Sequence, residues 1–257
     1  MINFIYGGNM FESKKSNIKK YLLYIFIFLV IYIGCISIIY LNDYYKADSL
    51  KIASFGEYEN ITKDVLGDGT LVFYDKDVEL KTGLIFYPGG KVENNSYEPL
   101  MVGCASEGFL CIVVNMPFNL AVFDIDKADE IKQRYSNIES WYIGGHSLGG
   151  AMAASYLESN YEDYSGLILL GSYSSVDLSN TSLEVLSIYG SNDGVLDFDK
   201  YNECRNNLPI NFKEHIIYGG NHAYFGVYGE QDGDGLAKIE NEEQINLTVD
   251  LIVSLMK

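Results

Sequence analysis

The sequence predicts an α/β protein in which a mostly parallel sheet is covered by helices on both faces, preceded by one N-terminal transmembrane helix. From residue 83 onward, short apolar runs alternate with segments of helical length, which is typical of parallel strands buried on both faces. Ahead of them, Tyr21–Leu41 is an apolar run of 21 residues without a charge. About 20 such residues span the hydrocarbon core of a bilayer.

The overall charge narrows the class of partner. The chain of 257 residues carries 35 acidic and 18 basic residues, a formal net charge of −17. Leaving out the four lysines and one glutamate ahead of the apolar run, the rest has 34 acidic and 14 basic residues. Because a nucleic acid requires a basic face, the composition argues against a nucleic-acid partner.

Charges flanking the apolar run predict its orientation. Four lysines lie on its N-terminal side, and positive residues favour the cytoplasmic side of a membrane. We therefore expect a cytoplasmic segment over 1–20, a transmembrane helix over 21–41, a juxtamembrane tether over 42–56 and the main domain outside the cytoplasm over 57–257. A cleaved signal peptide and a lipoprotein signal ending at Cys35 are the alternatives. The first usually has a shorter apolar region, and Tyr32 fits the second poorly.

The predicted elements of the domain follow in order. A hairpin over 58–62 and 71–74 turns at Gly67-Asp68-Gly69. Further strands are expected over 83–87, 109–115, 140–146, 166–171, 183–189 and 215–218. Helices are expected over 97–107, 124–135, 148–158, 198–206 and 241–256. In the last of these helices, Ile245, Val249, Ile252 and Met256 recur every three or four positions on one face.

The clearest motif is Gly145-His146-Ser147-Leu148-Gly149, which lies between an apolar strand and a run of small residues. This context is that of a nucleophile elbow, a sharp turn that exposes a serine above the sheet. Glycine two residues to either side removes the Cβ atoms that would clash in such a turn. A glycine-rich strand-to-helix turn without chemistry is the alternative interpretation.

Three histidines compete for the role of general base. His146 is adjacent to Ser147, so its side chain must point elsewhere, and His215 begins a strand. His222 follows the last strand in a glycine-flanked loop, and ligands of open α/β sheets bind at the carboxyl ends of strands. His222 is therefore the histidine predicted to take the proton of Ser147.

A serine nucleophile and a histidine base are completed by a catalytic acid, which orients the base. We expect this acid at the carboxyl end of a neighbouring strand, in the loop after the strand 183–189. Asp193 lies in the loop after the strand 183–189 and is the predicted acid. Asp197 and Asp199 lie nearby, and Asp177 follows the strand before. These three are fallbacks, because a loop aspartate is commonly a turn residue or a helix cap.

Two backbone N–H groups are predicted to form an oxyanion hole. Leu148 follows the nucleophile at a helix N-terminus, where backbone dipoles favour negative charge. The second donor is expected from Pro88-Gly89-Gly90-Lys91, after the strand 83–87, and the sequence does not choose between Gly89 and Gly90.

Four stretches carry a family resemblance: Tyr87–Val92, Met116–Ala121, Gly145–Ala151 and Gly219–Gly226. With the order Ser147, Asp193, His222, the chain resembles the α/β-hydrolase superfamily over residues 71–256, in particular the branch labelled alpha/beta hydrolase fold-5. It is similar at a distance to dienelactone hydrolases, which use a cysteine nucleophile where this chain has Ser147. The resemblance implies an α/β-hydrolase fold and a serine hydrolase acting on esters, without naming a substrate.

The sequence thus predicts a carboxylesterase-like enzyme that cleaves a small-molecule ester through an acyl-enzyme intermediate, without metal or cofactor. Lipase, thioesterase and peptidase activities stay open, because they use the same triad. A catalytically silent binding module on the same fold is the alternative from another class.

The stretch Asp232-Gly233-Asp234-Gly235 fails the EF-hand pattern, since Leu236 and Ala237 stand where a ligand and a glycine are needed. It is therefore interpreted as a turn.

Overall fold

The computed structural model describes residues 6–56 and 60–257. It divides the chain into two compact units, Met1–Asp43 and Tyr44–Lys257. The described part of the first unit is mainly the helix α1 (Tyr6–Asn42). Its segment Ile18–Asn42 is long and apolar enough to cross a bilayer, and none of its most apolar window is buried. This segment fits a single transmembrane helix and overlaps the predicted span.

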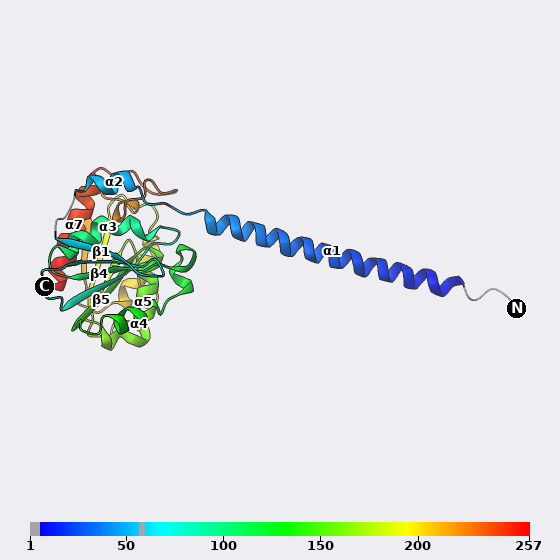
Figure 1. The fold of residues 1–257 in the computed structure, drawn as a ribbon, viewed down its shortest axis with the longest axis horizontal. Coiled ribbons are helices and arrows are strands. Elements are labelled where there is room, and N and C mark those ends of the chain that lie inside the picture. Colours follow the sequence, from blue (N-terminus) through cyan, green and yellow to red (C-terminus); the bar gives the residue numbers. More distant parts are fainter. Residues whose placement is uncertain (1–5, 57–59) are drawn as a thin grey trace. The chain divides into compact units, whose positions relative to one another are not determined.

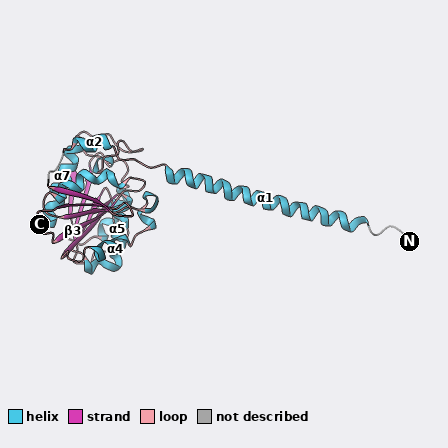
Figure 2. Ribbon diagram, in the orientation of Figure 1, coloured by secondary structure: helices cyan, strands magenta, loops and turns pink. Residues whose placement is uncertain are grey.

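The second unit is built on one eight-stranded sheet (Figure 2). Its strands are β1 (Ile61–Val65), β2 (Leu71–Asp75), β3 (Thr82–Tyr87), β4 (Leu110–Val113), β5 (Ser140–His146), β6 (Gly166–Leu170), β7 (Glu184–Gly190) and β8 (Lys213–Ile217). They lie in the order β1-β2-β4-β3-β5-β6-β7-β8. The β1–β2 and β2–β4 pairs are antiparallel, and the remaining pairs are parallel. The predicted hairpin and parallel sheet are both confirmed, and residues 58 and 59 of the hairpin lie outside the described residues.

Helices cover both faces of this sheet (Figure 1). They are α2 (Ser49–Ser54), α3 (Glu98–Ala105), α4 (Lys127–Arg134), α5 (Leu148–Asn160), α6 (Phe198–Cys204) and α7 (Asn241–Met256). Short 3₁₀ helices are η1 (Asn94–Tyr97), η2 (Pro117–Asn119), η3 (Ala121–Phe123), η4 (Tyr161–Asp163), η5 (Arg205–Asn207) and η6 (Ala223–Phe225). Side chains of α3 and α7 join the core on one face, and those of α4 and α5 join the core on the other.

The two cores explain why the parallel strands are apolar without alternation. In β3, Leu84 and Phe86 belong to the core with α3 and α7, whereas Ile85 and Tyr87 belong to the core with α4 and α5. Successive side chains of a strand point to opposite faces, and here both faces are dry. Because β3, β5, β6, β7 and β8 are parallel, their carboxyl ends lie at the same edge of the sheet. The loops after these strands contain the candidate functional residues.

The segment predicted over 42–56 as a juxtamembrane tether or short helix contains the short helix α2 and packs within the second unit. Tyr45 forms a parallel bridge with Val92, and its backbone exchanges hydrogen bonds with Lys91 and Glu93. Its ring lies 5.6 Å from that of Tyr228. Apolar side chains at 45, 52 and 55 pack on the core of the second unit. Residues 44–55 are therefore part of the compact unit, because they satisfy backbone groups and cover apolar surface there.

Candidate active site

The turn between β5 and α5 has the strained backbone of a nucleophile elbow. Ser147 lies at φ 52° and ψ −122°, in a region that side-chain-bearing residues rarely adopt. A Cβ on Gly145 would lie 2.6 Å from the backbone of Gly149. A Cβ on Gly149 would overlap the carbonyl oxygens of Tyr87 and Pro88. Both glycines are therefore required by backbone crowding around the serine.

His222 and Asp193 form a buried pair. His222 Nδ1 lies 2.8 Å from Asp193 Oδ2, and their side chains are at most 1% exposed. The other carboxylate oxygen, Oδ1, accepts the N–H groups of Val195 and Leu196 at 2.9 and 2.8 Å. Since the carboxylate is an acceptor, the proton of a neutral His222 ring lies on Nδ1 and its lone pair on Nε2. Within the described residues this Nε2 has no hydrogen-bond partner.

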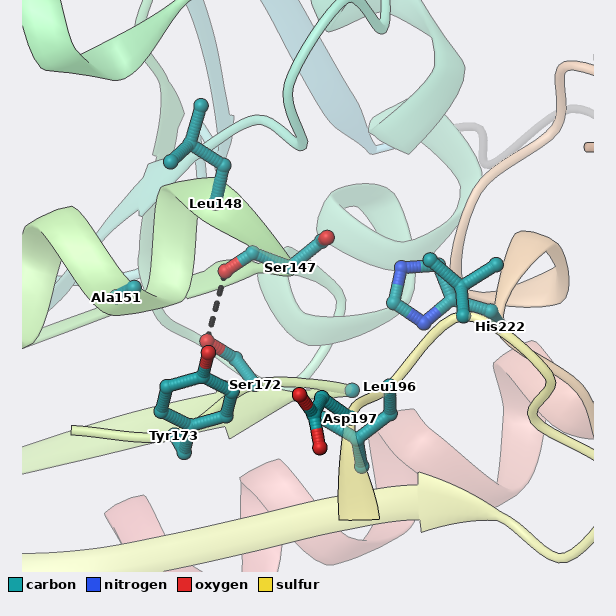
Figure 3. Close-up of a pocket in the computed structure, with 10 residues that line it drawn as sticks. Ser147, Leu148, Ala151, Ser172, Tyr173, Leu196, Asp197 and His222 are labelled. Atoms are coloured by element: carbon teal, nitrogen blue, oxygen red, sulfur yellow. Dashed lines mark hydrogen bonds between the residues drawn. The ribbon is translucent and has the colours of Figure 1, made fainter. Parts of the chain in front are cut away.

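Ser147 and His222 border the same cavity, whose volume is about 260 Å³. In Figure 3 the Ser147 side chain points toward the His222 ring, while the Ser147 carbonyl accepts a hydrogen bond from Ser172 Oγ at 2.7 Å. The cavity is also lined by Leu148, Ala151, Gly171, Tyr173, Val195, Leu196 and Asp197. The elbow serine and the His222 ring thus border a space that a small group could enter.

The loop after β3 presents its two glycines differently. Gly89 N–H donates to the Tyr97 hydroxyl oxygen at 2.9 Å, inside the protein. Gly90 N–H has no partner among the described residues. A Cβ on Gly90 would lie 3.0 Å from the Leu148 side chain, so Gly90 adjoins the start of α5. Leu148, the first residue of α5, has no helical acceptor for its own N–H.

Comparison with known proteins identifies the family of the chain. The model of the alpha/beta hydrolase family matches residues 83–246, which include the elbow, Asp193 and His222. The chain belongs to this family. A search of the curated proteins finds no match.

Solved structures share the α/β-hydrolase fold at low identity. TT1662 from Thermus thermophilus is 13% identical with a TM-score of 0.57, and covers 77% of this chain and 98% of its own. A protein described as a predicted CIB-like hydrolase from Thermoplasma acidophilum is 15% identical with a TM-score of 0.53, and covers 76% of this chain and 98% of its own. Est1E from Butyrivibrio proteoclasticus is 11% identical with a TM-score of 0.55, over 76% and 98%. Family and fold support a hydrolase, as the motifs predict.

The other candidate base and acids form no hydrogen bond with His222 among the described residues. His215 is exposed on β8. Asp197 lines the cavity but caps α6 by accepting Lys200 N–H at 3.0 Å. Asp199 is exposed in the first turn of α6, and Asp177 is exposed and accepts Ser179 N–H. Their positions match the cap and turn roles expected of loop aspartates.

Sequence reasoning missed two side chains that position the site. Asp234 lies in the turn interpreted as structural, yet its carboxylate accepts N–H groups from His222, Ala223 and Gly194. It therefore ties the loop after β8 to the loop after β7. Tyr97 binds both Gly89 and His146. The Asp-Gly stretch around Asp234 was interpreted only as a turn, and no motif marks Tyr97, because the partners of both residues come near them only on folding.

Within residues 6–56 and 60–257, no three side chains of His, Cys, Asp or Glu are grouped as a metal site would require. Four cysteines are free, and Cys104 and Cys111 are buried in the core. Burial raises the pKa of the Cys111 thiol well above its usual value, with Cys104 as a smaller cause. These two thiols are packing residues in the hydrolase.

Proposed function

We propose that the chain is a serine hydrolase that cleaves carboxylic esters through Ser147, His222 and Asp193. The observation that carries this proposal is the strained Ser147 backbone at the edge of a cavity that His222 also borders, with His222 Nδ1 held by Asp193 at 2.8 Å. A binding module has no need of a serine in strained backbone beside a buried imidazole–carboxylate pair. The catalytically silent alternative is accordingly less well supported.

The steps follow from the proton positions. Nε2 of His222 accepts the proton of Ser147 Oγ as the oxygen attacks the ester carbonyl. Asp193 stabilises the imidazolium and holds the ring through Nδ1–H. The imidazolium then protonates the leaving alcohol, and water attacks the acyl-enzyme by the same path in reverse. The chemistry uses these side chains and needs no cofactor.

We further propose that the N–H groups of Leu148 and Gly90 stabilise the tetrahedral oxyanion. Gly90 is preferred to Gly89 because the Gly89 N–H is already bound to Tyr97, whereas Gly90 adjoins Leu148. Donors aimed at a developing oxyanion in a dry site contribute much of the rate of acyl transfer. The choice between the two glycines therefore follows from which N–H is free.

The cavity supports a small substituent on the ester. Its volume of about 260 Å³ lies just below the range of roughly 300–1,000 Å³ typical of ligand pockets. Short acyl esters are thus preferred over long-chain lipids, thioesters or peptides. We also propose that α1 anchors the protein in the cell membrane, with residues 1–20 in the cytoplasm and the catalytic domain outside. Protease accessibility of intact cells tests this topology, and digestion restricted to residues 1–20 would reverse it.

The decisive experiment uses the full chain in detergent, with p-nitrophenyl esters of two to twelve carbons and a fluorophosphonate probe. We expect Ser147→Ala and His222→Ala to abolish labelling and turnover. Asp193→Asn should lower kcat by roughly 10³–10⁴-fold because the ring loses its tautomer. Asp199→Asn is the matched control, since Asp199 is exposed in the first turn of α6 and does not line the cavity. A folded wild type without labelling or turnover contradicts the proposal and leaves the binding module.

A further inference from the structure

A buried hydrogen-bond chain links the loop after β3 to the elbow strand. The Tyr97 hydroxyl accepts Gly89 N–H at 2.9 Å and lies 2.9 Å from His146 Nδ1. Both side chains are fully buried. A tyrosine hydroxyl has one proton, and Gly89 already acts as a donor to it. Among the described residues His146 Nδ1 is the partner left for the hydroxyl proton, so the hydroxyl donates to Nδ1 and a neutral His146 carries its own proton on Nε2.

His146 in turn packs on the proposed base. The ring centroids of His146 and His222 are 4.4 Å apart at an interplanar angle of 45°. The ring of Phe225, in the loop after His222, packs against the His146 ring at a centroid distance of 5.6 Å. Burial lowers the pKa of His146 well below its usual value, and the neighbouring His222 lowers it further. His146 is therefore kept neutral beside the proposed base, whose own ring nitrogen lies against the Asp193 carboxylate.

The chain thus joins the two halves of the proposed mechanism. At one end Tyr97 fixes Gly89, the residue before the proposed oxyanion donor Gly90. At the other end His146 supports the imidazole that must accept and return a proton. Neither side chain reaches the cavity, whose lining does not include Tyr97 or His146.

We propose that Tyr97 and His146 are a pair of positioning residues. They hold the oxyanion loop, residues 88–91, and the His222 ring in one productive arrangement. This inference rests on the proposed serine-hydrolase function. His146 Nε2 is buried without a partner among the described residues, a costly state for a polar atom. An apolar ring would pack there without that cost. The hydrogen bond at Nδ1 is the feature of His146 that an apolar ring lacks.

Tyr97→Phe tests the pair in the full chain, because it removes one oxygen and keeps the ring. We expect kcat for a short p-nitrophenyl ester to fall by roughly 10- to 100-fold, and KM to change less than threefold. Without the Tyr97 hydroxyl, Gly89 is held less firmly and the N–H group of the next residue, Gly90, shifts. Because this N–H group acts mainly in the transition state, kcat falls more than KM changes. Tyr201→Phe is the matched control: Tyr201 is also buried, and its hydroxyl binds Ser187 and Glu214. It should lower Tm by a few degrees and leave kcat unchanged.

His146→Phe and the double variant show whether the two residues act together. If they do, the double variant loses about as much kcat as either single variant, rather than the product of the two losses. The inference is wrong if Tyr97→Phe keeps kcat within twofold, matches Tyr201→Phe, or multiplies with His146→Phe. Should Tyr97→Phe fail to fold, the kcat and KM of His146→Phe decide by the same criteria. An inactive wild type would contradict the proposed function instead.

Discussion

The elbow and the histidine loop meet in one site, yet they are held in different ways. The elbow, residues 145–149, is fixed by backbone crowding: Cβ atoms on Gly145 or Gly149 would run into the backbone of β3 or α5. The histidine loop, residues 219–226, is fixed by distant side chains. Gln244 of α7 exchanges hydrogen bonds with the backbone of Asn221, and Asp234 accepts the N–H groups of His222 and Ala223.

This difference affects how each region responds to change. Crowding offers no intermediate state, since a methyl group either fits or displaces a strand. A set of hydrogen bonds loses its members one at a time, and each loss moves the imidazole by a small amount. We therefore expect substitutions in the elbow to act all or none, and those around the histidine loop to act by degrees.

Among substitutions that leave Ser147, His222 and Asp193 in place, the largest effect is expected from Gly149→Ala. Its Cβ would overlap the carbonyl oxygens of Tyr87 and Pro88, which belong to β3 and the oxyanion loop. Activity on a short ester should fall at least roughly 100-fold, because the elbow and the oxyanion loop must separate. Gly67→Ala is the matched control, since no atom lies within 4 Å of the position that its methyl group would take and its φ is ordinary. An active Gly149→Ala enzyme would show that crowding does not hold the elbow.

An intermediate effect is expected from Asp234→Asn. Asp234 Oδ1 accepts the N–H groups of Gly194, His222 and Gly235, and Oδ2 accepts that of Ala223 at 2.8 Å. An amide nitrogen cannot accept, so at least one bond is lost and the His222 and Asp193 loops loosen. We expect kcat to fall roughly tenfold with the fold intact, since small displacements of a base reduce the rate.

Asp232→Asn is the control for Asp234→Asn, because Asp232 is exposed in the same turn. Steady-state kinetics and thermal unfolding of both variants give the measurement. Equal kcat values for the two variants would mean that hydrogen bonds from Asp234 do not position His222.

The same contrast explains what the sequence could predict. Crowding needs glycines at fixed local spacing, so Gly145, Ser147 and Gly149 stand out in a single stretch. Apolar runs likewise predicted the parallel strands, because both faces are buried. The positioning residues had no such signal: Tyr97 acts on backbone 8 residues away, and Asp234 reaches back 40 residues to Gly194.

Two further features could not be predicted for the same reason: they depend on contacts that form only when the chain folds. These features are the choice between Gly89 and Gly90 and the docking of residues 44–55. Which glycine keeps a free N–H depends on where the Tyr97 hydroxyl lies after folding. The docked segment and the residue before it carry Asp43, Lys46 and Asp48, and these charges resemble those of a solvated linker. Its apolar side chains at 45, 52 and 55 find partners that only the folded domain provides.

The smallest expected effect is on the pH dependence of stability and comes from His146. This residue belongs to the elbow strand and contacts the histidine loop. Its pKa is held below the usual 6.5 by burial. Below pH 6.5 the unfolded chain therefore binds a proton that the folded chain excludes, and stability falls as the pH decreases. Above this pH the ring is neutral in both states and the contribution is constant.

Urea unfolding between about pH 5 and 8, followed by the fluorescence of the single Trp141 on β5, measures this contribution in wild type and His146→Phe. The difference between the two free energies of unfolding should be flat above pH 6.5, the usual pKa of the ring. Below it, the wild type should lose up to about 1.4 kcal/mol more per pH unit, until the folded pKa is reached. Parallel curves down to the lowest pH would mean that His146 titrates normally, and that the two regions are joined by a ring that can charge.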